Sequence, residues 1–93
     1  MKESAIQAKI MKHLEARGFV TMKTLVMNRS GIPDILACCP RGRLWGIEVK
    51  TFTGKASKLQ EVWIRRLQDN NAVAFIAFGY EDYLVKYDKA TVL

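Results

Sequence analysis

The sequence has too few nitrogen and sulfur ligands for a zinc site. Of its 93 residues, two are cysteine and one is histidine. Cys38 and Cys39 are adjacent, and neighbours on a strand point to opposite faces, so they are poorly placed to bridge each other. We therefore expect buried, reduced thiols and no disulfide framework. His13 is expected on the surface of a helix.

Long apolar segments are also missing. The longest uninterrupted apolar run, Ala72–Phe78, has seven residues, far short of the ~20 that a membrane-spanning helix needs. Met1–Ser4 lacks the apolar stretch of a signal peptide. A chain of this length has room for one small domain, residues 1–93. We expect it in the cytoplasm of a bacterial or phage-infected cell.

Acidic side chains are scarce in the first two thirds of the chain. Residues 1–66 carry thirteen Lys and Arg but five Asp and Glu, and residues 67–93 carry two and four. The net charge is +6. A basic excess of this kind predicts a polyanionic partner, because Lys and Arg release condensed counterions when they bind phosphates. Charge alone does not separate nucleic acid from anionic lipid.

The hydrophobic pattern predicts an α/β fold with a mixed sheet flanked by helices. Helices are expected over Glu3–Arg17, Ser57–Asn70 and Tyr80–Leu93, and strands over Phe19–Met27, Ile32–Cys39, Leu44–Thr51 and Ala72–Phe78. The turn residues Pro40–Arg43 join the second and third strands into an antiparallel hairpin. The helix between the third and fourth strands makes these two parallel neighbours. The fourth is apolar throughout, as expected for a central strand covered on both faces.

The hairpin predicts that Asp34 lies close to Glu48 and Lys50. Residues that face each other in an antiparallel hairpin have position numbers with a constant sum, which a turn at 41–42 sets at roughly 82–84. Asp34 therefore faces a residue within Glu48–Lys50. Glu48 and Lys50 share a face because they are two positions apart. All three side chains can converge there.

Two facing carboxylates indicate a divalent cation. Like charges on cross-strand neighbours are destabilising unless something offsets them. Hard oxygen ligands at this spacing suit Mg²⁺ or Mn²⁺, and Lys50 would lie within reach of a metal-bound water or the scissile phosphate. The alternative is a solvated strand face with Asp34 in an ordinary turn after Pro33. The position of Pro33-Asp34 opposite a polar pair that interrupts an apolar run favours the metal site.

Gln60 and Glu3 each have a local structural explanation. Gln60 follows Ser57 at the spacing of a capping box, in which its side chain reaches back to the N-cap amide. Glu3 lies in the first turn of its helix, where a negative charge favours the helix dipole. Glu3 also falls on the inward face, three residues before Ile6 and seven before Ile10. That position would direct its carboxylate toward the core.

These residues resemble the PD-(D/E)xK nuclease superfamily, and within it the VRR-NUC family of phage and bacterial stand-alone nucleases. The motif components read here as Glu3, Gly31-Ile32-Pro33-Asp34, Ile47-Glu48-Val49-Lys50, Gly54 and Ser57-Lys58-Leu59-Gln60. The expected element order, αβββαβ, is that of the restriction-endonuclease-like core. The Val-Arg-Arg string that names the family is absent, and Ile64-Arg65-Arg66 is the nearest string.

The resemblance implies metal-dependent hydrolysis of phosphodiester bonds. It assigns Mg²⁺ or Mn²⁺ to Asp34, Glu48 and the backbone carbonyl of Val49. Lys50 would orient or activate water. By the same resemblance Gln60 and Glu3, the latter through water, would support the network of metal and water.

Basic residues in the expected turns and at a helix start indicate how DNA is held. We expect phosphate contacts on either side of the cut from Arg29, Arg41, Arg43, Lys55 and Lys58. No zinc finger, aromatic-rich RNA motif or clear recognition helix is present, which favours recognition of shape and backbone. We expect a structure-selective endonuclease for branched DNA such as four-way junctions. The alternatives are a catalytically silent nucleic-acid-binding module and an RNA endonuclease of similar fold.

A homodimer is expected as the working unit. Branched junctions are resolved by paired nicks, which a two-fold dimer supplies. The chain also carries more apolar surface than a small core hides. Several aromatic residues lie in the less basic last third, among them Tyr80, Tyr83 and Tyr87. The last strand and the tail are therefore the expected interface.

Overall fold

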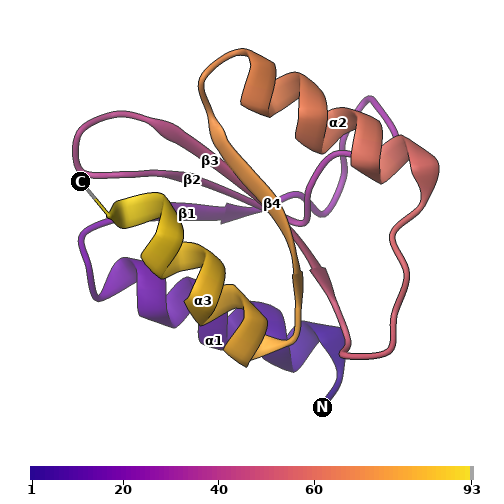
Figure 1. Cartoon of the computed structure of the whole chain (residues 1–93), viewed down its shortest axis with the longest axis horizontal. Coiled ribbons are helices and arrows are strands. Elements are labelled where there is room, and N and C mark those ends of the chain that lie inside the picture. Colours follow the sequence, from indigo (N-terminus) through magenta and orange to yellow (C-terminus); the bar gives the residue numbers. More distant parts are fainter. Residues whose placement is uncertain (93) are drawn as a thin grey trace.

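The computed structural model describes residues 1–92 as a four-stranded sheet with helices on both faces (Figure 1). The elements in chain order are α1 (Glu3–Glu15), β1 (Val20–Lys23), β2 (Ile35–Cys38), β3 (Leu44–Lys50), α2 (Lys58–Asp69), β4 (Val73–Phe78) and α3 (Tyr80–Thr91). Leu93, the last residue of the expected tail helix, lies outside the described residues. Within residues 1–92 none of the helices combines the length and apolarity needed to cross a membrane.

The sheet is mixed, as the sequence predicts. Its strand order is β1-β2-β3-β4, with antiparallel pairing on both sides of β2 and parallel pairing of β3 with β4. Ile35 lies opposite Ile47 in the β2–β3 hairpin. Continuing this register by one residue places Asp34 opposite Glu48, inside the expected range.

The first two strands are shorter than expected. β1 ends at Lys23. The next residue, Thr24, still donates its N–H to the carbonyl of Asp34 (3.0 Å), and its hydroxyl donates to the carbonyl of Pro33 (2.6 Å). β2 begins only at Ile35, since Pro33 has no N–H to give to a ladder. Leu25–Met27, expected in the first strand, form an exposed loop instead.

β4 is an edge strand, so the expected central position was wrong. Its apolar sequence has another cause, because α2 packs on one of its faces and α3 on the other (Figure 1). Both helices also send side chains to its open edge. Gln68 Nε2 donates to the carbonyl of Ala74 (2.8 Å), and Lys86 Nζ donates to that of Ile76 (2.6 Å). These contacts block the edge against pairing with another strand.

The main core lies between the sheet and the helices α1 and α3. Ile6, Ile10 and Leu14 of α1 are buried there, as their spacing predicts. Glu3 is exposed, so its expected inward orientation was wrong. Residues 3–5 are all exposed, because the first turn of α1 extends past the part of the helix that packs on the core.

The tyrosines of α3 point into this core. Tyr83 is fully buried, and its hydroxyl lies 2.7 Å from Nδ1 of His13. His13 is thus half-buried, not on the surface as expected, and burial and the nearby Arg17 lower its pKa. Tyr80 and Tyr87 lie beside Tyr83 and are half-buried. The aromatic residues assigned to a dimer interface therefore largely serve the core.

α2 covers the opposite face of the sheet. It begins after the N-cap residue Ser57, as predicted, and packs against β3 and β4. Ile64 is its buried residue, whereas Leu59 and Val62 are each 46% exposed. The expected apolar stripe of α2 is therefore only partly covered.

Two glycines with the same backbone conformation allow a matched test of how the loop before Asp34 is held. Gly31 and Gly42 both have φ +87°, but a Cβ on Gly31 would lie 2.7 Å from Leu59 Cγ, while nothing lies within 4 Å at Gly42. Gly42→Ala should cost about 1 kcal/mol from the left-handed backbone alone. Gly31→Ala should cost about 3 kcal/mol because overpacking against α2 adds to it. Urea unfolding measures both, and equal losses would contradict the close contact.

Candidate active site

Two carboxylates meet on the face of the sheet that α2 covers. Glu48 lies within β3 and is 2% exposed. Asp34 immediately precedes β2, and its Oδ2 accepts a hydrogen bond from the N–H of Val49 (2.9 Å). This bond ties the Asp34 side chain to β3. The structure thus brings Asp34 and Glu48 together, as the hairpin register predicts.

The two oxygens of Glu48 have different surroundings. Oε2 accepts a hydrogen bond from Gln60 Nε2 (3.0 Å) and lies 3.5 Å from Lys50 Nζ. Oε1 is buried and has no hydrogen-bond partner among residues 1–92. A buried polar atom without a partner is costly, and such atoms are rare in folded proteins. Oε1 is therefore an acceptor that the described residues leave without a hydrogen-bond partner.

The surroundings of Glu48 disfavour its charge. Burial raises the pKa of Glu48 to about 7, and the negative charge of Asp34 acts in the same direction. The ammonium of Lys50 acts in the opposite direction and only partly offsets them. A metal-free protein therefore holds a strained carboxylate near neutral pH, which an added positive charge would relieve.

Gln60 completes the predicted capping box and also contacts Glu48. Its Oε1 accepts from the N–H of Ser57 (2.8 Å), and its own N–H donates to Ser57 Oγ (3.1 Å), which completes the capping box. Its Nε2 remains free for Glu48. The cap fixes the amide plane of Gln60, so the start of α2 also holds the carboxylate.

Lys50 ends β3 on the same face as Glu48. Its side chain is 16% exposed, so the ammonium is only partly accessible to solvent. The backbone carbonyl of Lys50 accepts from the N–H of Gly79 (2.9 Å), where β4 ends. The position of Lys50 is thus set by its pairing with β4, and its ammonium lies beside Glu48, so the predicted convergence of Asp34, Glu48 and Lys50 is confirmed.

A third acidic ligand is not part of this arrangement. Glu3 is on α1, which covers the other face of the sheet. Across residues 1–92 no group of three or more Asp, Glu, His or Cys side chains is placed to hold a metal ion. Glu3 therefore does not join the two carboxylates.

The five predicted phosphate-binding residues fall at two ends of the sheet. Arg29 and Lys55 lie in the connections before Asp34 and after Lys50, and Lys58 is the first residue of α2. Arg41 and Arg43 lie in the β2–β3 turn, where Arg43 Nε donates to the carbonyl of Asn71 (2.6 Å). Arg43 and Glu48 are five positions apart along extended chain, a distance of about 16 Å. Arg41 and Arg43 are therefore not close to the carboxylates, because a hairpin turn lies at the opposite end of the strands from the termini that carry them. Their phosphate contacts stay a prediction.

Thr24 is a positioning residue that sequence reasoning missed. Its amide and hydroxyl hold the carbonyls of Asp34 and Pro33. These bonds fix the backbone from which the Asp34 side chain projects. A threonine after a strand is too common a feature for the sequence to indicate this role.

The oxygen atoms that could coordinate a metal here fit a small, hard divalent cation. Asp34 and Glu48 supply carboxylate oxygens, one of them the unpartnered Oε1. The N–H and C=O of a strand residue point to the same side, and the N–H of Val49 points to Asp34. The carbonyl of Val49 is therefore directed to the same side. Two carboxylates and one carbonyl match Mg²⁺, which keeps several waters when it binds to proteins.

Comparison with known proteins identifies the family of this chain. The model of the VRR-NUC domain matches residues 1–80. The chain belongs to the VRR-NUC family. A solved VRR-NUC domain is 30% identical with TM-score 0.78, covering 91% of this chain and 95% of its own. A second solved VRR-NUC domain protein, 17% identical with TM-score 0.74, covers 98% of this chain and 88% of its own and shares the fold.

The match confirms the predicted family and fold class. The mixed sheet flanked by helices is that of VRR-NUC structures and is consistent with a restriction-endonuclease-like core. A VRR-NUC domain is a nuclease-family domain, which supports a nuclease function for this chain. No curated protein shows significant similarity to the sequence.

The raised pKa of Glu48 predicts a pH-dependent stability of the metal-free protein. From its usual value of 4.5 the pKa rises to about 7 on folding. The folded chain therefore retains a proton that the unfolded chain releases between these values. The stability that this proton confers is complete below pH 4.5 and is lost as pH rises to 7. Relative to Glu48→Gln, wild type should lose about 3 kcal/mol over this range.

Urea unfolding in a chelator, from pH 4 to 8, measures this difference. Glu61→Gln is the matched control, because Glu61 is an exposed carboxylate on α2. Its stability should follow the wild-type curve. Parallel pH curves for wild type and Glu48→Gln would contradict the raised pKa.

Proposed function

We propose that this VRR-NUC domain is a Mg²⁺- or Mn²⁺-dependent endonuclease that hydrolyses phosphodiester bonds in DNA. The observation that carries the proposal is the buried, unpartnered Oε1 of Glu48 beside Asp34. Two carboxylates held together in this way favour a bound cation. A cation there would neutralise a phosphate oxygen and lower the pKa of a bound water.

The remaining residues of the site have separate roles in this proposal. Gln60 holds Glu48 in place through its amide nitrogen. Lys50 supplies positive charge next to the carboxylates, where it would orient water and stabilise the negative charge that accumulates on the phosphate. Asp34 is held by the amide of Val49. Glu3 is exposed on α1, apart from the two carboxylates, and its role through water stays a prediction.

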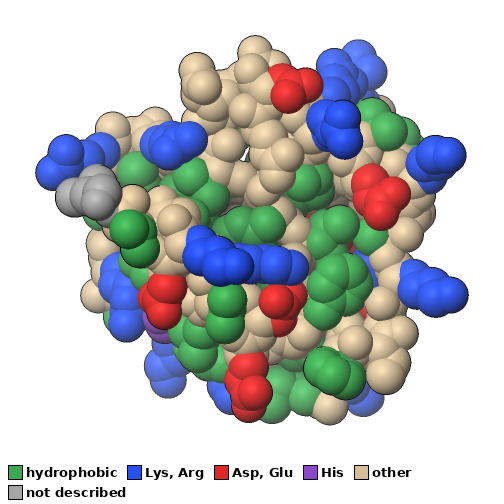
Figure 2. Space-filling model, viewed as in Figure 1, with side chains coloured by type: hydrophobic (Ala, Val, Ile, Leu, Met, Phe, Trp, Pro, Cys, Tyr) green, Lys and Arg blue, Asp and Glu red, His purple; other side chains and the backbone are tan. Residues whose placement is uncertain are grey.

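The basic surface supports a nucleic-acid substrate. Figure 2 shows Lys and Arg side chains at and beyond α2. Lys58 lies at the first position of α2, and Lys55 lies in the loop before it. Both follow Lys50 closely along the chain, so phosphates next to the scissile one would contact them. We propose branched DNA as the substrate, cut in the cytoplasm of a bacterial or phage-infected cell.

We also propose that the enzyme acts as a homodimer. α2 packs over β3 and β4, and the β1–β2 half of the same face is apolar and partly open. This open half-face consists of Val20, Met22, Leu36, Cys38 and Leu44. Val20, Met22 and Leu44 are 64%, 49% and 41% exposed.

A second copy suits the open half-face better than DNA does. None of its five side chains is charged, whereas a phosphate-binding surface needs cations. A flat apolar sheet face can pack on an identical one about 10 Å away. Further exposed apolar area comes from Leu25–Met27, which follow β1, and from Leu59 and Val62 of α2. This area counts toward the ~800 Å² that a stable interface buries per partner. This placement replaces the last strand and tail, whose aromatic residues are largely in the core.

The catalytic assignment predicts loss of cleavage without loss of binding. Asp34→Ala and Glu48→Ala should lower the cleavage rate by at least about a thousandfold, and Lys50→Ala by at least about a hundredfold. DNA binding should persist in both carboxylate variants, since neither removes positive charge. Asp69→Ala removes an exposed acid and is the control. Full activity of Glu48→Ala, or of wild type in a chelator, would overturn the assignment.

The substrate class needs a panel of matched nucleic acids. Single-stranded, duplex, flapped and four-way substrates, each made as DNA and as RNA, are incubated with Mg²⁺ or Mn²⁺. Preferred cutting of branched DNA is the expected result. Preferred cutting of RNA would identify an RNA endonuclease, and binding without any cutting would identify a silent module.

The dimer proposal predicts a mass of two chains in solution at micromolar concentration. Val20→Lys combined with Met22→Lys places two charges in the open half-face and should raise the dimer dissociation constant by at least a hundredfold, which is about 2.7 kcal/mol. Val85→Lys is the control, since Val85 is 53% exposed on α3, across the sheet. Light scattering measures both. If Val85→Lys dissociates the dimer and the Val20→Lys, Met22→Lys variant does not, the interface lies on α3 and the proposal is wrong.

A further inference from the structure

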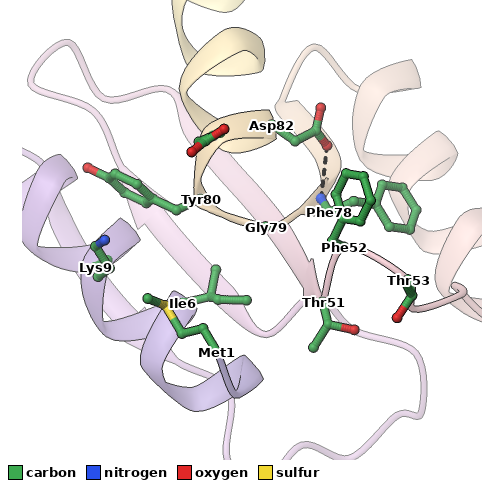
Figure 3. Close-up of a pocket in the computed structure, with 11 residues that line it drawn as sticks. Met1, Ile6, Lys9, Thr51, Phe52, Thr53, Phe78, Gly79, Tyr80 and Asp82 are labelled. Atoms are coloured by element: carbon green, nitrogen blue, oxygen red, sulfur yellow. Dashed lines mark hydrogen bonds between the residues drawn. The ribbon is translucent and has the colours of Figure 1, made fainter.

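A hollow of about 680 Å³ opens at the end of the sheet, one residue beyond Lys50. It lies between the start of α1, the loop after β3 and the start of α3 (Figure 3). Thr51 and Gly79 are part of its lining, and the N–H of Gly79 bonds to the carbonyl of Lys50. The hollow therefore lies at the end of β3 where Lys50 leaves the strand, and the backbone of Lys50 is hydrogen-bonded to its lining.

Phe52 stands at the edge of this hollow on a tight turn. The N–H of Gly54 donates to the carbonyl of Thr51 (3.0 Å), which closes the turn around Phe52 and Thr53. A Cβ on Gly54 would lie 3.3 Å from the Cβ of Lys50, so the turn packs against the lysine. Phe52 is 87% exposed. A rigid turn thus displays an aromatic ring two residues from Lys50.

The opposite side of the hollow carries a cation and a second aromatic ring. Lys9 Nζ lies 4.7 Å from the centroid of the Tyr80 ring, and both side chains line the hollow (Figure 3). Thr51 and Thr53 add hydroxyl groups on the Phe52 side. The lining therefore combines ring surface, hydrogen-bonding groups and one amine from α1.

The acidic residues of the hollow limit how much negative charge it can accept. Asp82 is already engaged, because its Oδ2 accepts from Lys86 Nζ and from the N–H of Phe78, both at 2.8 Å. Glu81 is exposed on the lining. Its carboxylate opposes the approach of several phosphates, so a duplex backbone is disfavoured here. A ligand with a flat ring and a single phosphate fits these charges.

We propose that this hollow binds one unpaired nucleotide of the DNA substrate, with its base against Phe52 and its phosphate at Lys9. This inference rests on the proposed nuclease function. Every base has a face that stacks on an aromatic ring, and such stacking tolerates any sequence. A paired base inside a duplex is already stacked and does not reach the ring. The hollow therefore selects substrates with unpaired nucleotides beside the cut.

The role of Phe52 is tested by the preference for branched over linear DNA. In Phe52→Ala, the ratio of kcat/KM for flapped over duplex DNA of the same sequence should fall at least tenfold. Phe52→Trp should restore the ratio, because it restores a stacking surface. Val85→Ala is the control. An unchanged ratio in Phe52→Ala would overturn the proposal. Since Phe52 is mostly exposed, the melting temperature of Phe52→Ala should match that of wild type.

A binding measurement separates failure of this proposal from failure of the nuclease function. Wild-type protein in a chelator is titrated into flapped DNA that carries 2-aminopurine at one unpaired position beside the branch. Stacking should quench its fluorescence, and Phe52→Ala should remove the quenching. Lys9→Gln should weaken binding of the flapped DNA more than that of the duplex. Quenching without cleavage by the metal-loaded protein would reject the nuclease and keep the hollow, whereas cleavage without quenching would reject the hollow.

Discussion

The burial of the Glu48 carboxylate is the constraint around which the rest of the candidate site is arranged. The carboxylate lies within β3, beside a second carboxylate and with one oxygen unpartnered. Neither condition favours folding. Both persist because the strand is held on the other face by a core that includes Ile47 and Val49, which are fully buried. The same strand therefore contributes Ile47 and Val49 to the core on one face and the buried, incompletely hydrogen-bonded carboxylate of Glu48 on the other.

The two faces of the sheet differ accordingly. α1 and α3 cover one face, with closely packed isoleucines and tyrosines. α2 alone covers part of the other face and leaves Leu59 and Val62 nearly half exposed. A small domain has limited apolar burial available, and here most of it lies on the face away from the carboxylates. The face with the carboxylates is the less completely covered of the two.

α2 links the stability of the fold to the order of the site. Its capping box fixes Gln60, and Gln60 fixes Glu48. At its other end Gln68 protects the edge of β4. One helix thus connects the carboxylate, its own N-terminus and the sheet edge. Mutations that loosen this helix are expected to affect activity and stability together.

Local sequence patterns determined the elements and the register of the hairpin. The spacing of Ile6, Ile10 and Leu14 determined the buried face of α1. The turn at 40–43 determined which residues of β2 and β3 face each other, and so brought Asp34 to Glu48. These predictions succeeded because helix periodicity and hairpin register depend on neighbours that are close in the sequence.

Contacts between distant segments were decided only by the tertiary structure. Nothing local shows that the first turn of α1 extends past the core and leaves Glu3 exposed, or that β4 is an edge strand protected by Gln68 and Lys86. The amide of Gln60 could be assigned to the cap from sequence, but its bond to Glu48 required α2 to be placed over β3. The physical reason is the same in each case, since a side chain's burial and partners depend on which elements pack together in space.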